Sequence, residues 1–288
     1  MAPEIWRRFG NVANYVEPFF GSGAVLLGRP HWRPDGKRLV ETVNDADGLL
    51  TNFWRAVAAD PEAVAHHAAW PVNEIDMRAR HAWLVGEREA ITASLTADPL
   101  WFDPRAAGWW AWGLGANAIP DGLHTTRARA GVAGRSPQGA VALDRRGGLL
   151  ARCMALAERL KFARIKSGDW ARCVKSPAAM GGIEREMFGV FLDPPYAGTD
   201  AQYATTGSVE TDVWAWAVEA ARGERMRICV AGYEDGRTVP DGWAVVTWEG
   251  HGGYGRRANG AGRANAKRER LWFSPHCLDP DAGQMALL

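Results

Sequence analysis

The segment FLDPPY (191–196) joins an acid, two prolines and a tyrosine in an order that could do chemistry on an amino group. It follows an apolar run, so Asp193 is expected at the carboxyl end of a buried strand. Pro194 and Pro195 stiffen the chain and lack backbone N–H donors, which leaves the carboxylate and nearby carbonyl groups as acceptors. These acceptors can take both hydrogens of an exocyclic amino group and so localise its lone pair for nucleophilic attack.

Two tyrosines accompany this acceptor-rich segment. Tyr196 offers an aromatic face on which a nucleobase can stack, a contact worth about 1 to 3 kcal/mol. Tyr203 is a second aromatic candidate for the same pocket. The structural alternative for the whole segment is a rigid Pro-Pro turn followed by a buried tyrosine.

A turn rich in small residues, EPFFGSG (17–23), lies where a strand is expected to pass into a helix. Small residues allow the backbone to approach a ligand closely, and the N–H groups at the start of a helix can face a polar group. An ordinary tight turn explains the segment equally well. The residues of this turn that we expect to contact a cofactor are Glu17, Pro18, Phe19, Gly21 and Gly23.

The next strand is expected within 38–48, and its polar end contains Asn44 and Asp45. A carboxylate at this place can accept hydrogen bonds from both ribose hydroxyls of a nucleoside cofactor. Together with the turn at 17–23, this strand end suggests an adenosine-containing ligand. The alternative is that Asp45 or Asp47 caps the helix that follows.

The hydrophobic pattern places these segments in an open α/β sheet with a helical and loop insertion of roughly 100 residues after the second strand. The expected elements are strand, loop and helix over 14–27, a strand within 38–48, helices between 49 and 110, a loop rich in glycine and arginine over 113–148, a helix over 149–163, a short strand ending at SGDW, a strand in MFGVFL (187–192), a helix near 208–222, a strand over 225–233, and a final strand pair in WAVVTWEG and ERLWFSP.

Composition excludes several classes of protein. With 288 residues, 47% hydrophobic and 23% charged, the chain has ordinary globular usage, which argues against wholesale disorder and coiled-coil or collagen-like architectures. The four cysteines form no CxxC pair and the histidines have no ligand spacing, so neither a metal site nor a disulfide framework is expected. We find no secretory leader and no apolar stretch that predicts a membrane span, and we expect a cytoplasmic location.

These segments resemble the DNA amino-methyltransferases, in particular the Dam-like DNA adenine methylases of bacteria and phages. NYVEPFFGSGAVLL (14–27) looks like the first cofactor motif of that family, ETVNDADG (41–48) like its ribose-binding strand end, and FLDPPY like its catalytic tetrapeptide. The tail AGRANAKRERLWFSPHC (261–277) also resembles that of phage members. The likeness therefore covers nearly the whole chain.

The resemblance implies a Rossmann-like, S-adenosylmethionine-dependent methyltransferase sheet with a mainly helical and loop insertion for target recognition. Residues 1–50 and 160–288 would form the catalytic domain, and 51–159 the insertion. SGDW (167–170) is similar to the motif that faces the cofactor adenine, which adds Asp169 and Trp170 to the cofactor-binding residues.

The activity that the resemblance implies is methyl transfer from S-adenosylmethionine onto the N6 amino group of a flipped adenine in double-stranded DNA. The transfer would be a direct displacement without a metal or a covalent enzyme intermediate. Two alternatives stay open, which are N4-cytosine methylation and a catalytically impaired DNA-binding relative. No membrane partner is expected.

Local charge supports a DNA partner, although the net charge is only +1. Between Arg127 and Arg172 eleven basic residues face three acidic ones, and over 256–270 six basic residues face only Glu269. Two such patches around the 191–196 segment suit phosphate contacts along a duplex, although a solvated surface is the alternative for each. The candidate DNA-binding residues are Arg127, Arg129, Arg135, Arg145, Arg146, Tyr203, Arg256 and Arg257.

One departure from the family concerns the beginning of the printed sequence. Members usually carry a glycine-lysine motif of the form FGGK ahead of the helix that corresponds to APEIWRRFG (2–10), where it helps to hold the methionine end of the cofactor. That motif does not precede this segment here, so weak cofactor binding is expected unless another segment replaces it. GHGGYG (250–255) is a conceivable replacement, and a β-hairpin turn is the alternative interpretation.

Overall fold

The computed structural model of the protein describes residues 1–32, 39–115, 148–175, 186–195, 206–247 and 269–280. The chain divides into two compact units. Unit 1 comprises Met1–Asn44 and Asp169–Leu288, and unit 2 comprises Asp45–Gly168.

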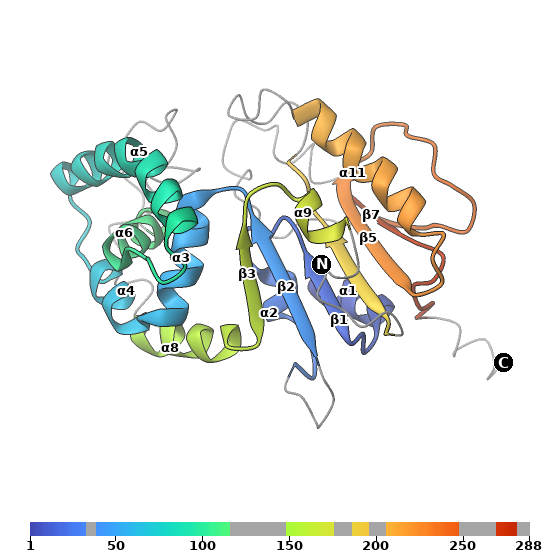
Figure 1. Ribbon diagram of the computed structural model, residues 1–288, viewed down its shortest axis with the longest axis horizontal. Helices are drawn as coiled ribbons and strands as arrows, with labels where there is room; N and C mark the ends of the chain where they lie inside the picture. Colours follow the sequence, from blue (N-terminus) through green and yellow to red (C-terminus); the bar gives the residue numbers. More distant parts are fainter. Residues whose placement is uncertain (33–38, 116–147, 176–185, 196–205, 248–268, 281–288) are drawn as a thin grey trace. The chain divides into compact units, whose positions relative to one another are not determined.

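The protein is α/β, and the residues that the structure describes include seven strands in one mixed sheet (Figure 1). The strands are β1 (Asn14–Glu17), β2 (Val40–Asp45), β3 (Ala163–Ser167), β4 (Phe188–Leu192), β5 (Met226–Tyr233), β6 (Ala244–Thr247) and β7 (Glu269–Phe273), in the order β3-β2-β1-β4-β5-β7-β6. β1 pairs in parallel with β2 and β4, and β4 with β5, whereas β7 is antiparallel to β5 and β6. The first five positions are those of a doubly wound, Rossmann-like sheet.

Both faces of β4 are buried in unit 1, which explains the unbroken apolar run of this strand. Its helices are α1 (Ala2–Phe9), α2 (Ala24–Leu27), α9 (Ala171–Val174) and α11 (Thr206–Ala220). Val190 and Leu192 share a core cluster with Val213 of α11. A side-chain carbon at Gly189 would instead lie 2.9 Å from the ring of Phe9 in α1. Because side chains alternate along a strand, α11 covers one face of β4 and α1 the other (Figure 1).

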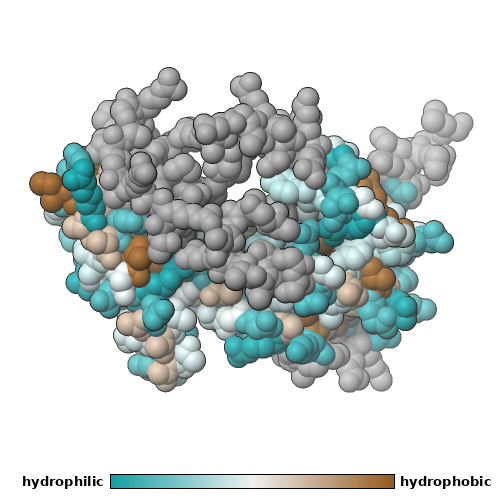
Figure 2. Space-filling model, turned by 90° about the horizontal axis from the view of Figure 1, so that it is seen from above, coloured by the Kyte–Doolittle hydropathy of each residue, from teal (hydrophilic) through white to brown (hydrophobic). Residues whose placement is uncertain are grey.

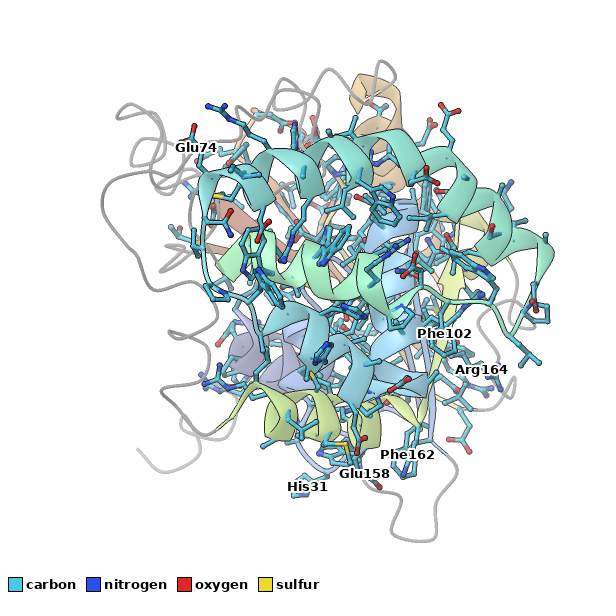
Figure 3. All side chains as sticks on the ribbon, turned by 90° about the vertical axis from the view of Figure 1, so that its left-hand side faces the viewer. His31, Glu74, Phe102, Glu158, Phe162 and Arg164 are labelled. Atoms are coloured by element: carbon cyan, nitrogen blue, oxygen red, sulfur yellow. The ribbon has the colours of Figure 1, made fainter. Side chains whose placement is uncertain are left out.

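Unit 2 is mainly helical. Its elements are α3 (Gly48–Ala59), α4 (Pro61–Ala68), α5 (Glu74–Ala97), α6 (Pro104–Gly115), α8 (Leu149–Leu160) and β3. Leu84 of α5 and Trp112 of α6 are fully buried in a shared core. In Figure 3, Glu74 marks the beginning of α5 and Glu158 lies near the end of α8.

Polar side chains cap the beginnings of three helices in unit 2. Asp47 accepts backbone N–H bonds at the beginning of α3, Asp60 does so for α4, and Asn73 does so for α5. Such caps satisfy donors that a helix leaves without partners in its first turn. Helices were expected in this part of the chain and are confirmed, and α3, α4 and α5 each begin at a capping side chain.

The structure corrects two expected boundaries. The helix expected over 149–163 ends at Leu160, because β3 begins at Ala163. The helical stretch expected to about residue 110 is broken between α5 and α6, where the carboxylate of Asp103 accepts the backbone N–H of Ala106. The expected division into a catalytic domain of 1–50 and 160–288 and an insertion of 51–159 stays a prediction.

On the face shown in Figure 2, the described surface is largely hydrophilic, with hydrophobic residues as scattered spots among polar ones. None of the helices in the described ranges combines the length and the apolar character needed to cross a membrane.

Candidate functional site

The candidate site lies at the carboxyl ends of β1 and β4 in unit 1. β1 is followed in the chain by its neighbour β2, whereas β4, its parallel neighbour on the other side, comes later in the chain. Open α/β sheets bind ligands at such a switch point, outside the carboxyl ends of the strands. Glu17 is the last residue of β1, and Asp193 directly follows β4. The fold therefore brings together two acids that are far apart in the sequence.

Glu17 is almost completely buried, with 2% of its surface exposed. The Tyr15 hydroxyl donates a hydrogen bond of 2.8 Å to Glu17 Oε2. Burial raises the pKa of Glu17 from 4.5 to about 8; the Tyr15 bond and a backbone bond from Leu26 lower it, whereas the charges of Asp193 and Glu41 raise it. At neutral pH this carboxyl group is mostly protonated, and a cation beside it would favour the ionised form.

No Lys, Arg or His side chain in the described residues forms an ion pair with Glu17. A buried acid normally has such a partner, since an unpaired buried charge is costly. A cationic group placed beside Glu17 would offset the cost of ionising it.

The turn after β1 is held in place by Asn44. The side-chain amide of Asn44 donates to the Pro18 carbonyl at 3.0 Å, and its backbone carbonyl accepts the Phe20 N–H at 2.8 Å. Gly21 and Gly23 have positive φ angles of 48° and 66°, which other residues rarely adopt. The expected small-residue turn is thus present. Asn44 is buried and supports it, a role that the sequence pattern did not indicate.

Asp45 and Asp47 have different surroundings in unit 2. Asp47 is the N-cap of α3 and also pairs with Arg88 at 2.9 Å. The capping alternative is therefore confirmed for Asp47. Asp45 is not the cap of this helix; its Oδ1 accepts the Asp47 N–H at 2.9 Å. Its predicted contact with a ribose stays a prediction.

Trp170 and Phe19 meet in unit 1. Their rings are stacked, with centroids 6.0 Å apart and an interplanar angle of 27°. Trp170 also makes an edge contact with Trp216 at 6.2 Å. The neighbouring Asp169 is exposed, and its Oδ1 accepts the N–H of Ala171 at the beginning of α9. Two segments expected to bind one cofactor thus contact each other through aromatic rings.

The acceptor-rich segment is described as far as Pro195. Asp193 and Pro195 are partly exposed, whereas Pro194 is buried. The remaining predicted residues lie outside the described part of the chain, as does GHGGYG (250–255); they are Tyr196, Tyr203, Arg127, Arg129, Arg135, Arg145, Arg146, Arg256 and Arg257. Their proposed contacts with a base or with DNA stay predictions.

Sequence reasoning missed two residues of this sheet edge. Tyr15 lies two positions before Glu17 and so on the same face of β1, which was the available signal. Glu269 begins β7 opposite Tyr233, the last residue of β5. Burial and the charge of Asp193 both raise the pKa of Glu269. No local pattern could have placed Glu269 near Asp193, because the pairing of β7 with β5 brings it there.

The described residues contain no group of three or more His, Cys, Asp or Glu side chains arranged to hold a metal ion. The described groups of the site are acceptors, carboxyl groups and aromatic rings, which can orient an amine and hold a cation.

Searches against protein-family models and curated proteins each found no match to this chain.

Proposed function

We propose that the protein transfers a methyl group from S-adenosylmethionine to the N6 amino group of adenine in DNA. The observation that carries this proposal is the position of buried Glu17 and the Asp193–Pro195 segment at one switch point of the sheet. Glu17 suits a cationic group and the Asp193–Pro195 segment suits an amino group. The proposed reaction needs both, because a methyl group passes from a cationic donor to an amine. The resemblance to Dam-like methylases supports the same reaction.

S-adenosylmethionine supplies a methyl group that is activated on a sulfonium cation. Glu17 fits such a cofactor, since a cation beside it would favour the carboxylate and offset the cost of its burial. In this proposal Phe19 and Trp170 hold the cofactor adenine and Asp45 the ribose. Gly21 and Gly23 give the turn the backbone shape for close approach.

The target base must leave the helical stack to reach Asp193, which costs a few kcal/mol that contacts in a pocket offset. The Asp193 carboxylate and the Pro194 carbonyl accept the two N6 hydrogens, and Tyr196 stacks on the base. The lone pair on N6 is thereby localised and oriented, and the carboxylate polarises the N–H bond whose proton is lost after transfer. Orientation of this kind supplies a large part of the rate enhancement. The basic patches over 127–172 and 256–270 would hold the DNA phosphates.

The test is incubation of the full chain with labelled S-adenosylmethionine and unmethylated DNA, followed by nucleoside mass spectrometry. Labelled N6-methyladenine is the expected product. Labelled N4-methylcytosine would correct the base, and DNA binding without any labelled nucleoside would indicate a catalytically impaired relative. Asp193→Asn should lose the product, whereas Asp212→Asn, which removes an exposed acid of α11, should retain it.

A further inference from the structure

Tyr15 lies in the centre of unit 1 with no measurable exposure. Its ring contacts two aromatic residues of α1, Trp6 at 4.9 Å and Phe9 at 6.4 Å between centroids. Trp6 is itself fixed by a hydrogen bond of 2.8 Å from its Nε1 to the Val25 carbonyl. Because packing fixes this ring, the position of the hydroxyl group is fixed as well.

The fixed hydroxyl group in turn restrains a functional carboxyl group. Tyr15 donates to Glu17 Oε2 at 2.8 Å, and both side chains are buried. A hydrogen bond between groups with little freedom orients the acceptor at low entropic cost. An ordinary buried strand residue, such as leucine or phenylalanine, would fill this space without making that bond.

Among the described residues, the charges that act on Glu17 are both acidic. Asp193 at the end of β4 and Glu41 of β2 both act on it as negative charges. Glu41 is neutralised by Arg29 at 2.9 Å. On α1, which packs on Tyr15, Glu4 pairs with Arg8 at 2.8 Å and also with Arg7.

We infer that Tyr15 is a positioning residue, which holds the Glu17 carboxyl group toward the cationic end of the cofactor, and that Glu17 releases its proton when that end binds. This inference rests on the proposed function. The proton leaves the Glu17 carboxyl group for solvent, and the ligand's positive charge takes its place beside the carboxylate.

The pH dependence follows from the direction of each effect. Binding requires ionised Glu17, so affinity should rise with pH and reach a plateau above the pKa of about 8. The Tyr15 hydrogen bond lowers that pKa, so its removal should move the plateau to higher pH. A purely structural role for Tyr15 would weaken binding equally at every pH.

The experiment is isothermal titration calorimetry of the full chain with S-adenosylmethionine between pH 6.5 and 9, in buffers of different ionisation enthalpy. The variants are Tyr15→Phe and Glu17→Gln, with Asp212→Asn as a control that removes an exposed acid. Glutamine does not titrate, so any proton released when Glu17→Gln binds S-adenosylmethionine comes from the ligand's own amino group. The number of protons that this variant releases is therefore subtracted from the number that each other protein releases. Adenosine, which lacks the cationic end, is the matched ligand control.

Relative to Glu17→Gln, the wild type should release about one proton at pH 7 and nearly none at pH 9. Tyr15→Phe should bind about three- to tenfold more weakly at pH 7 and should release about a quarter to a half of a proton at pH 9, which is more than the wild type releases there. Adenosine should bind all variants alike, without this release.

Two failures are distinguishable. If the wild type binds adenosine and S-adenosylmethionine equally weakly, the proposed function fails and this inference with it. If S-adenosylmethionine binds well but Tyr15→Phe leaves the pH profile unshifted, or the wild type releases no more protons than Glu17→Gln, only the inference is overturned.

Discussion

Two buried acids on neighbouring strands of unit 1 differ in what surrounds them. Glu41 in β2 pairs with Arg29 at 2.9 Å, and the guanidinium group of Arg29 lies over the Trp6 ring at 5.0 Å. Glu17 in β1 has the Tyr15 hydroxyl group instead, and no cation among the described residues forms an ion pair with it. The first charge is neutralised within the fold. For Glu17, a cationic ligand could supply the counter-charge.

Three acids of unit 2 resemble Glu41, because each has a partner within the fold. Asp47, Asp60 and Asp103 all accept backbone N–H groups at helix starts, and Asp47 also pairs with Arg88. An acid with such partners serves the stability of the fold. The contrast teaches that the acids at the carboxyl ends of β1 and β4 are the ones to test for function.

The largest effect is expected at Asp193. Asp193→Ala should lower the rate of methyl incorporation at least about a hundredfold, because in the proposed mechanism only the neutral Pro194 carbonyl would remain to orient the target amine. Cofactor binding and the unfolding midpoint should change little, since Asp193 is partly exposed. Turnover equal to that of the Asp212→Asn control would refute the assigned role.

The next effect separates a structural pair from a functional acid. Arg29→Ala should lower the free energy of unfolding by about 3 to 5 kcal/mol, because it leaves Glu41 buried without its partner. The matched control is Arg78→Ala, which breaks an exposed pair with Glu74 and should cost less than about 1 kcal/mol. Urea unfolding of both variants measures the difference, and equal losses would contradict the comparison.

Glu17→Gln should change how stability depends on pH. The folded pKa of about 8 lies above the unfolded value of 4.5, so the wild type loses stability as pH rises through this interval. Glutamine carries no such titration, so the variant should gain about 3 kcal/mol relative to the wild type between pH 5 and pH 8. Urea unfolding at both pH values tests this. A constant difference would mean that Glu17 titrates normally.

The smallest effect concerns the two aspartates at the beginning of unit 2. Asp47→Ala should cost about 1 to 2 kcal/mol of unfolding free energy through loss of the α3 cap, without changing cofactor affinity. Asp45→Ala should lower cofactor affinity and leave the unfolding free energy nearly unchanged if the Asp45 carboxylate binds a ribose hydroxyl group. Calorimetry and urea unfolding on both variants separate the roles, and identical behaviour would reject the distinction between them.

Much of the fold was predictable where local signals are strong. β4 was expected from its apolar run and β5 from a similar one, and both are largely buried strands that pair in parallel with each other. The boundary between α8 and β3 was not, since KFARIKS (161–167) favours neither a helix nor a strand strongly and its pairing decides the outcome. The break between α5 and α6 depended on the Asp103 cap, which a composition pattern does not register.

The sequence by itself determined the chemistry available to this protein. The segment after the apolar strand is rich in acceptors in any fold, because Asp193 carries a carboxylate and the prolines Pro194 and Pro195 lack a backbone donor wherever they lie. Only the tertiary structure decided that Glu17 lies near that segment, accepts a hydrogen bond from the Tyr15 hydroxyl group and forms no ion pair with a cation of the described residues. Strand pairing and depth of burial set these neighbours, and burial shifts a carboxyl pKa by an amount that no local sequence pattern encodes.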